Sequence, residues 1–125
     1  MSDKKKILII EDDSVMQNAL QEYLAGEGFE IICAVDGEVG ERMANSEKPD
    51  LILLDIVIPK KDGYEVLSEI KKDEATKDIP VILLTNLGSI EDIEKALNMG
   101  ATNYLVKADY KLEEVSAKIK EVLKM

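Results

Sequence analysis

The chain has 125 residues, of which 46% are hydrophobic and 34% charged, and these values predict one globular domain, residues 1–125, with no room for a second. A net charge of −10 argues against direct binding to nucleic acid or to an anionic membrane, because both surfaces would repel this one. Histidine is absent, which excludes histidine-based catalysis and histidine-rich metal sites.

The remaining composition predicts a cytoplasmic protein. The single cysteine, Cys33, permits no internal disulfide and is expected to pack as a small apolar residue in a reducing compartment. The apolar run near the N-terminus is too short for a secretion signal, and no segment approaches the length of a membrane span.

Five short apolar runs predict five strands. They are Ile7–Ile10, Glu30–Val35, Leu51–Leu54, Val81–Leu84 and Asn103–Val106. The central three do not alternate polar with apolar residues, which indicates that both faces of the sheet are covered, as in a parallel sheet.

Helical patterns lie between and after these runs. The first is expected to begin at Ser14 with "SVMQ" (Ser14 to Gln17) as a capping box and to end at Gly26 or Gly28. The other four are expected around Glu38–Ala44, from Gly63 to Lys72, over Ser89–Asn98, and from Leu112 through Val122. This alternation predicts an open α/β fold with helices on both faces of a parallel sheet and a ligand crevice at the carboxyl ends of the strands.

Polar residues follow four of the predicted strands. Glu11, Asp12 and Asp13 follow the first, Asp55 the third, Thr85 the fourth and Lys107 the fifth. Converging carboxylates within about 4 Å repel by roughly 4 kcal/mol per pair at an effective dielectric near 20, so a cation is needed to hold them together. All-oxygen ligation by few protein groups suits Mg²⁺.

A phosphoryl group on Asp55 would match this site. Its three outer oxygens would find three partners in the metal, the Thr85 hydroxyl and the Lys107 ammonium. Taken one at a time, each of these residues is more often a turn former, a surface group or a helix cap. Their combination at consecutive strand ends favours a phosphoryl site.

Four segments in order, "IIEDDS", "LILLDIVIPKKDGYEVL", "IPVILLTN" and "ATNYLVKAD", closely resemble the receiver domain of two-component response regulators. The resemblance implies a flavodoxin-like, doubly wound sheet of order 2-1-3-4-5. It also implies the following roles: Asp55 as phosphoacceptor, Asp12 as Mg²⁺ ligand beside Glu11, the carbonyl of Val57 as a further ligand, Thr85 and Lys107 on the phosphoryl oxygens, and Tyr104 as the aromatic switch. Asp13 is left as a flanking or capping acid.

The resemblance further implies a signalling switch and not an enzyme with a separate substrate. The chain would catalyse only its own phosphorylation and dephosphorylation, taking the phosphoryl group from a sensor histidine kinase or a phosphotransfer protein. A downstream protein would dock on the fourth helix, fifth strand and fifth helix, and the chain would be a monomer or weak dimer, either a single-domain regulator or a piece of a longer one.

Four positions depart from the family pattern. Ala108 follows Lys107, where the family usually has proline, so the loop after the fifth strand is expected to differ in shape. Asn86 is larger than the usual residue after Thr85, and Val57 and Leu87 are apolar where polar residues often position water. We expect these side chains to shield an aspartyl phosphate from water, and its hydrolysis should therefore be slow.

Three other protein classes share part of this pattern. A flavin-binding flavodoxin is disfavoured because three acids in its phosphate loop would repel the ligand. A dehalogenase-type phosphatase usually has a second aspartate two residues after the first, as an acid/base group. This chain has Val57 at that position, which disfavours such a phosphatase. A receiver-like module that binds proteins without being phosphorylated stays open.

Overall fold

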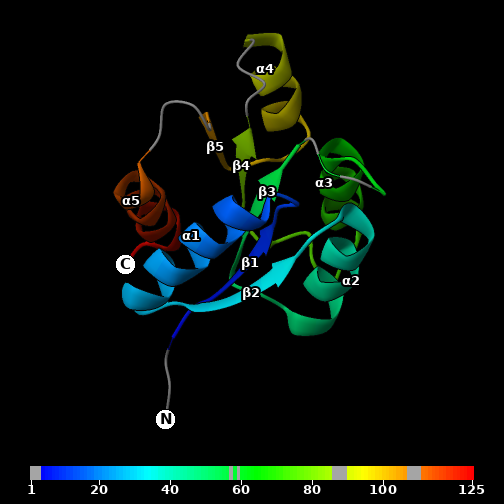
Figure 1. Cartoon of the computed structure of the whole chain (residues 1–125). Coiled ribbons are helices and arrows are strands. Elements are labelled where there is room, and N and C mark those ends of the chain that lie inside the picture. The colour runs from blue at the N-terminus through cyan, green and yellow to red at the C-terminus, as the bar shows by residue number, and fades with distance from the viewer. Residues whose placement is uncertain (1–3, 57, 59, 86–89, 107–110) are drawn as a thin grey trace.

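A computed structural model describes residues 4–56, 58, 60–85, 90–106 and 111–125, and within these ranges five strands alternate with five helices (Figure 1). The strands are β1 (Lys6–Ile10), β2 (Glu30–Ala34), β3 (Leu51–Asp55), β4 (Val81–Thr85) and β5 (Asn103–Val106). The helices are α1 (Ser14–Gly26), α2 (Gly37–Glu47), α3 (Gly63–Lys72), α4 (Ile90–Asn98) and α5 (Leu112–Leu123).

All strand pairs are parallel, and the sheet has the order β2-β1-β3-β4-β5. The predicted fold class and strand order are therefore confirmed. The chain leaves β1 toward β2 on one side and then crosses to β3 on the other side. The carboxyl ends of β1 and β3 are adjacent at this reversal, where Ile10 pairs with Leu54, and this is the place at which such sheets bind ligands.

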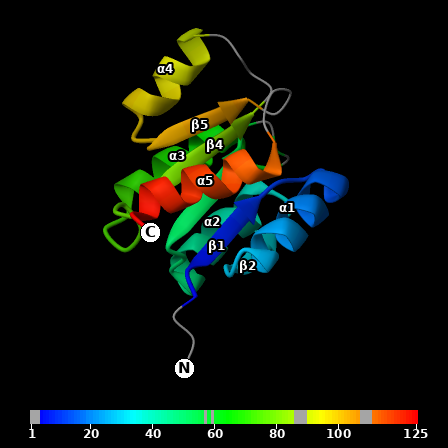
Figure 2. The same ribbon diagram turned by 90° about the vertical axis from the view of Figure 1, so that its left-hand side faces the viewer.

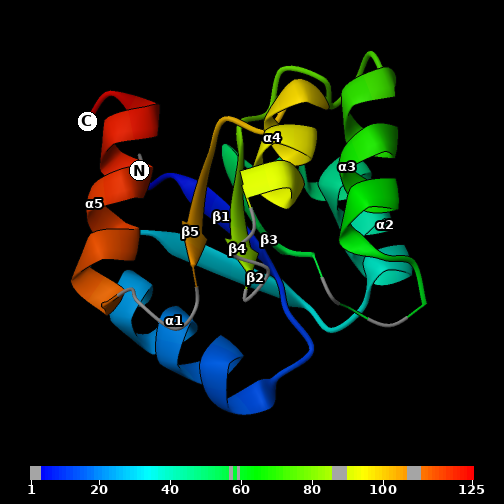
Figure 3. The ribbon, with the colours of Figure 1, turned by 90° about the horizontal axis from the view of Figure 1, so that it is seen from above.

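Two apolar cores cover the two faces of the sheet. Alternate residues of β1 and β3 point to opposite faces, so that Leu8 and Leu54 enter the core under α2, α3 and α4, whereas Ile7 and Leu53 enter the core under α1 and α5. Figure 3 shows these two groups of helices on opposite sides of the sheet, and Figure 2 shows α5 in front of the strands. Burial of both faces explains why β3 has no polar residue before Asp55.

Two glycines allow α2 to approach its neighbours closely. A Cβ atom at Gly40 would lie 2.6 Å from the Cδ1 atom of Ile10, the last residue of β1. A Cβ atom at Gly37 would lie 1.9 Å from the carbonyl oxygen of Lys61, in the loop between β3 and α3. The side chain of Lys61 also forms an ion pair with Glu41 of α2, so α2 contacts the segments on both sides of the β1/β3 reversal.

Element ends differ from the prediction in a few places. β2 ends one residue early, at Ala34, and α2 is longer at both ends than Glu38–Ala44. Ser14 is not the N-cap of α1. Asp13 has the extended cap conformation, and its carboxylate accepts the backbone N–H groups of Val15 and Met16. The predicted capping box is therefore wrong, and the capping role considered for Asp13 is confirmed.

Cys33 lies on β2, half-buried against the α1/α5 core, and its thiol contacts Oε1 of Gln21 at 3.8 Å. Burial raises the pKa of this thiol, as expected for a cysteine that packs as an apolar residue. Within the described ranges, none of the helices combines the length and the apolar character that a membrane span requires.

Candidate functional site

Glu11 and Asp12 are placed by the end of β1. The backbone N–H of Glu11 donates to the carbonyl of Ala34 on β2 at 3.0 Å, which extends the β1/β2 ladder by one residue. The Glu11 side chain is buried, at 1% exposure, and its Oε2 atom accepts the N–H of Asp13 at 3.2 Å. Asp12 is exposed. The acidic pair thus offers one enclosed and one open carboxylate at the rim of the sheet.

Asp55 is the last residue of β3 and is 4% exposed. The loop that follows it returns to the strand, because the N–H of Gly63 donates to the carbonyl of Ile56 at 2.8 Å. A Cβ atom at Gly63 would lie 2.5 Å from the Cα of Ile56 and 2.7 Å from the carbonyl oxygen of Asp55. Glycine is therefore required at the start of α3 for the chain to close against the phosphoacceptor candidate.

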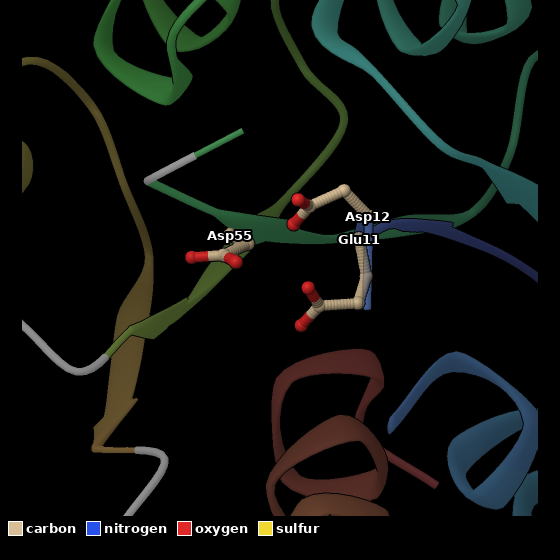
Figure 4. A group of neighbouring side chains, drawn as sticks. All are labelled: Glu11, Asp12 and Asp55. Carbon is tan, nitrogen blue, oxygen red and sulfur yellow. The ribbon is translucent and has the colours of Figure 1, made fainter. Parts of the chain in front are cut away.

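These three carboxylates converge. Each of Glu11, Asp12 and Asp55 offers an oxygen, and the three oxygens lie within 4.8 Å of one another. Figure 4 shows Glu11 and Asp12 extending from the end of β1 toward the side on which Asp55 ends β3. At this separation each pair of charges repels by about 3 kcal/mol at an effective dielectric near 20. Hard oxygen ligands with one open side fit Mg²⁺, which retains several of its waters.

The structure describes some of the other predicted site residues and not others. Thr85 ends β4 opposite Val106 of β5, so its backbone lies at the same rim, but its side chain is outside the described part of the chain. Val57 and Lys107 also lie outside the described residues, as do Asn86, Leu87 and Ala108. Their predicted roles stay predictions.

Tyr104 is described and lies on β5, next to Leu83 of β4. Its side chain is half-buried and packs against the core under α2, α3 and α4, whereas the next residue, Leu105, enters the opposite core. Tyr104 therefore belongs to the face that α4 covers. The structure shows this one position and tests no rotamer change.

The sequence predicts a role for Gln17 only in a helix cap, as the last residue of "SVMQ". In the structure its Nε2 atom donates to the carbonyl of Glu11 at 3.0 Å and to the carbonyl of Ala34 at 3.3 Å. Glu11 directly follows β1 and Ala34 is the last residue of β2, so the two carbonyls come near each other only once the strands are paired in register. The helical position of Gln17, one turn after the acidic segment, was the available signal.

Three comparisons bear on this site. A family model described as "Response regulator receiver domain" matches residues 7–120. The DNA-binding dual master transcriptional regulator RpaA of Synechocystis is 40% identical over 119 residues, which cover 95% of this chain and 49% of that protein. The probable transcriptional regulator ycf27 of Galdieria sulphuraria is 40% identical over 121 residues, covering 97% of this chain and 46% of that protein. The chain thus spans about half the length of the curated relatives that it matches.

Solved structures agree with the family model. The receiver domain of a sensor histidine kinase from Pseudomonas aeruginosa, with a magnesium ion coordinated in its active-site cleft, is 30% identical with a TM-score of 0.86, covering 94% of this chain and 96% of that one. A CheY-like response regulator receiver domain protein from Methanospirillum hungatei is 30% identical with a TM-score of 0.90, covering 97% of this chain and 94% of that one.

Proposed function

The chain belongs to the response regulator receiver domain family, and from this membership we propose that it is a phosphorylation-dependent switch that accepts a phosphoryl group on Asp55. Members of this family act in two-component, phosphorylation-based signalling. The observation that carries the assignment to Asp55 is the convergence of its buried carboxylate with those of Glu11 and Asp12, all within 4.8 Å. A buried acid among acids at a strand end is costly for a structural role and suited to holding a cation beside a phosphoryl group.

Magnesium is the cofactor that fits these residues. Asp12 and Asp55 would be direct ligands, with Glu11 beside them and the carbonyl of Val57 as a further ligand. When bound, Mg²⁺ offsets the negative charge of the carboxylates and of the incoming phosphoryl group. A neighbour of the same fold has magnesium at its active-site cleft, which supports the choice of metal.

In the proposed reaction a carboxylate oxygen of Asp55 attacks the phosphorus of a phosphohistidine on a sensor kinase or phosphotransfer protein. The new O–P bond forms as the P–N bond breaks, and the bonding electrons leave with the imidazole nitrogen. Lys107 and Thr85 would contact the outer phosphoryl oxygens. The chain thereby catalyses only a reaction on its own residue, and later hydrolysis by water restores Asp55.

The acyl phosphate adds charge and acceptor oxygens where there was a carboxylate. We infer that Thr85 then moves toward these oxygens and that Tyr104 turns inward into the space this leaves. The docking face of α4, β5 and α5 would change as a result, and a downstream protein would read the change. Tyr104 packs on the α4 face, which is consistent with this route.

The relatives RpaA and ycf27 are transcriptional regulators, and one of them is described as DNA-binding. For this 125-residue chain we propose protein partners in the cytoplasm and no direct contact with DNA, because a net charge of −10 would be repelled by phosphates.

Mass spectrometry tests the proposal. The chain is incubated with Mg²⁺ and acetyl phosphate, and the intact mass is expected to rise by one phosphoryl group that maps to Asp55. Asp55→Asn should remain unmodified, whereas Asp78→Asn, which removes an exposed acid elsewhere, should be modified like the wild type. No modification of the wild type by acetyl phosphate or by a phosphorylated kinase would favour the alternative, a protein-binding module that acts without phosphorylation.

A further inference from the structure

Gln17 links three segments at the base of the acidic cluster. It lies on the first turns of α1, and its half-buried side chain reaches back to the ends of β1 and β2. One amide nitrogen donates to both the Glu11 carbonyl, at 3.0 Å, and the Ala34 carbonyl, at 3.3 Å. The two acceptors are both carbonyl oxygens, so the nitrogen and not the oxygen of the amide must face them.

These bonds orient the peptide between Glu11 and Asp12. The N–H of Glu11 is already held by Ala34 at 3.0 Å, and Gln17 holds the carbonyl of the same residue. The next residue is fixed too, because Asp13 donates its N–H to Glu11 Oε2 and caps α1 with its own carboxylate. The backbone is therefore held by hydrogen bonds on both sides of Asp12.

Repulsion among the acids makes this orientation important. Without a cation, the charges of Glu11 and Asp12 favour a backbone that moves away from Asp55. A segment that is free to relax must be brought back when the ion binds, and that cost lowers the affinity. We propose that Gln17 is a positioning residue for the metal site: it touches neither ion nor phosphoryl group, but holds the acidic segment in its binding geometry.

The inference rests on the proposed function, and Gln17→Met tests it. Methionine keeps the length of the side chain and removes the N–H donors. Gln21→Met is the matched control, because Gln21 is one turn further along α1 and contacts Cys33 instead of the acidic segment. MgCl₂ is titrated into each 125-residue chain by calorimetry, and urea unfolding in EDTA checks that each variant is folded.

We expect the Kd for Mg²⁺ to rise about tenfold in Gln17→Met, the lower end of the range for residues that orient metal ligands, and to stay within twofold in Gln21→Met. The Mg²⁺ concentration that half-saturates phosphorylation by acetyl phosphate should rise by the same factor, while the rate at saturating Mg²⁺ is unchanged. A purely structural role for Gln17 would not separate these two quantities.

The wild-type chain provides a second measurement that does not depend on the variant folding. By NMR, the Gln17 side-chain NH₂ protons should exchange with solvent more slowly than those of the exposed Gln21. An unchanged Mg²⁺ affinity in Gln17→Met, an equal loss in both variants, or equally fast exchange at the two side chains would overturn the inference. Failure of the wild type to bind Mg²⁺ would instead overturn the proposed function.

Discussion

Replacement of Asp55 by asparagine should make the metal-free protein more stable. The substitution keeps the shape of the side chain and removes one of three clustered negative charges. Asp55 faces two other carboxylates within 4.8 Å, and each pair at that distance repels by about 3 kcal/mol at an effective dielectric near 20. Because Asp12 is exposed, solvent weakens the repulsion between Asp12 and Asp55. We therefore expect a net gain of about 1 to 3 kcal/mol in the free energy of unfolding.

Magnesium should reverse the order of the two proteins. An ion that binds only the folded state adds about 1.4 kcal/mol of stability at ten times its Kd and about 4 kcal/mol at a thousand times its Kd, which exceeds the gap of about 1 to 3 kcal/mol expected in EDTA. The wild type should gain this amount, whereas Asp55→Asn has lost a charged ligand and should gain little. The measurement is urea unfolding followed by circular dichroism, in EDTA and across a series of MgCl₂ concentrations.

Glu22→Gln serves as the control for net charge, because Glu22 is an exposed acid of α1 away from the cluster. It should change the stability in EDTA by no more than about 0.5 kcal/mol. If Asp55→Asn were instead less stable than the wild type in EDTA, the reasoning would be refuted. The carboxylate of Asp55 would then be held more strongly by neighbouring cations or donors than it is repelled by Glu11 and Asp12.

Three further predictions concern other parts of the chain. Gly37→Ala should lower the free energy of unfolding by about 1 to 3 kcal/mol in urea, because its Cβ would lie 1.9 Å from a backbone carbonyl of the loop after β3. Ser116→Ala should lower the free energy of unfolding above pH 4.5 and not well below it. The Ser116 hydroxyl donates to Glu27 and is the main cause that lowers the pKa of that carboxyl from 4.5. Stability that comes from a lowered carboxyl pKa is lost as the pH falls through the pKa of the folded state. Val57→Asn or Leu87→Glu should accelerate release of inorganic phosphate from the phosphorylated protein, if apolar residues at these positions keep water away.

Each of these predictions has an outcome that contradicts it. Gly26→Ala is the counterpart of Gly37→Ala, since nothing lies within 4 Å of its added Cβ, and it should be neutral or slightly stabilising; equal losses in both variants would argue against the close contact. For Ser116→Ala, a stability difference that persists unchanged below pH 4 would remove Glu27 from the explanation. Unaltered phosphate release in both of the last variants would count against shielding by Val57 and Leu87.

Apolar runs and helical periodicity predicted all five strands and five helices of the described chain, because burial on both sheet faces leaves a strong pattern. The strand order came from the resemblance, since periodicity does not say which strands are neighbours. The cap of α1 was missed because Asp13 and Ser14 are both good N-cap residues, and only the backbone conformation decides between them.

The acidic cluster was predictable because the ends of parallel strands share one edge of the sheet, so residues far apart in sequence had to meet there. Glu11, Asp12 and Asp55 do meet. The bond from Gln17 was not predictable, because its acceptors are main-chain carbonyls, which every residue has. Position in space, and not residue type, selects them.

The close packing of α2 has a consequence for how a signal would travel. α2 packs against Ile10 at Gly40 and against Lys61 at Gly37, and neither contact has room for a Cβ atom. On the other side of the site, Ala96 is the one buried side chain among those of α4 that the structure describes, and a contact of Lys95 over the ring of Tyr64, 4.1 Å from its centroid, adds only about 0.5 to 1 kcal/mol. A backbone displacement at Asp55 would thus be resisted more by the close packing of α2 than by the few buried contacts described for α4. The displacement would therefore be directed toward α4.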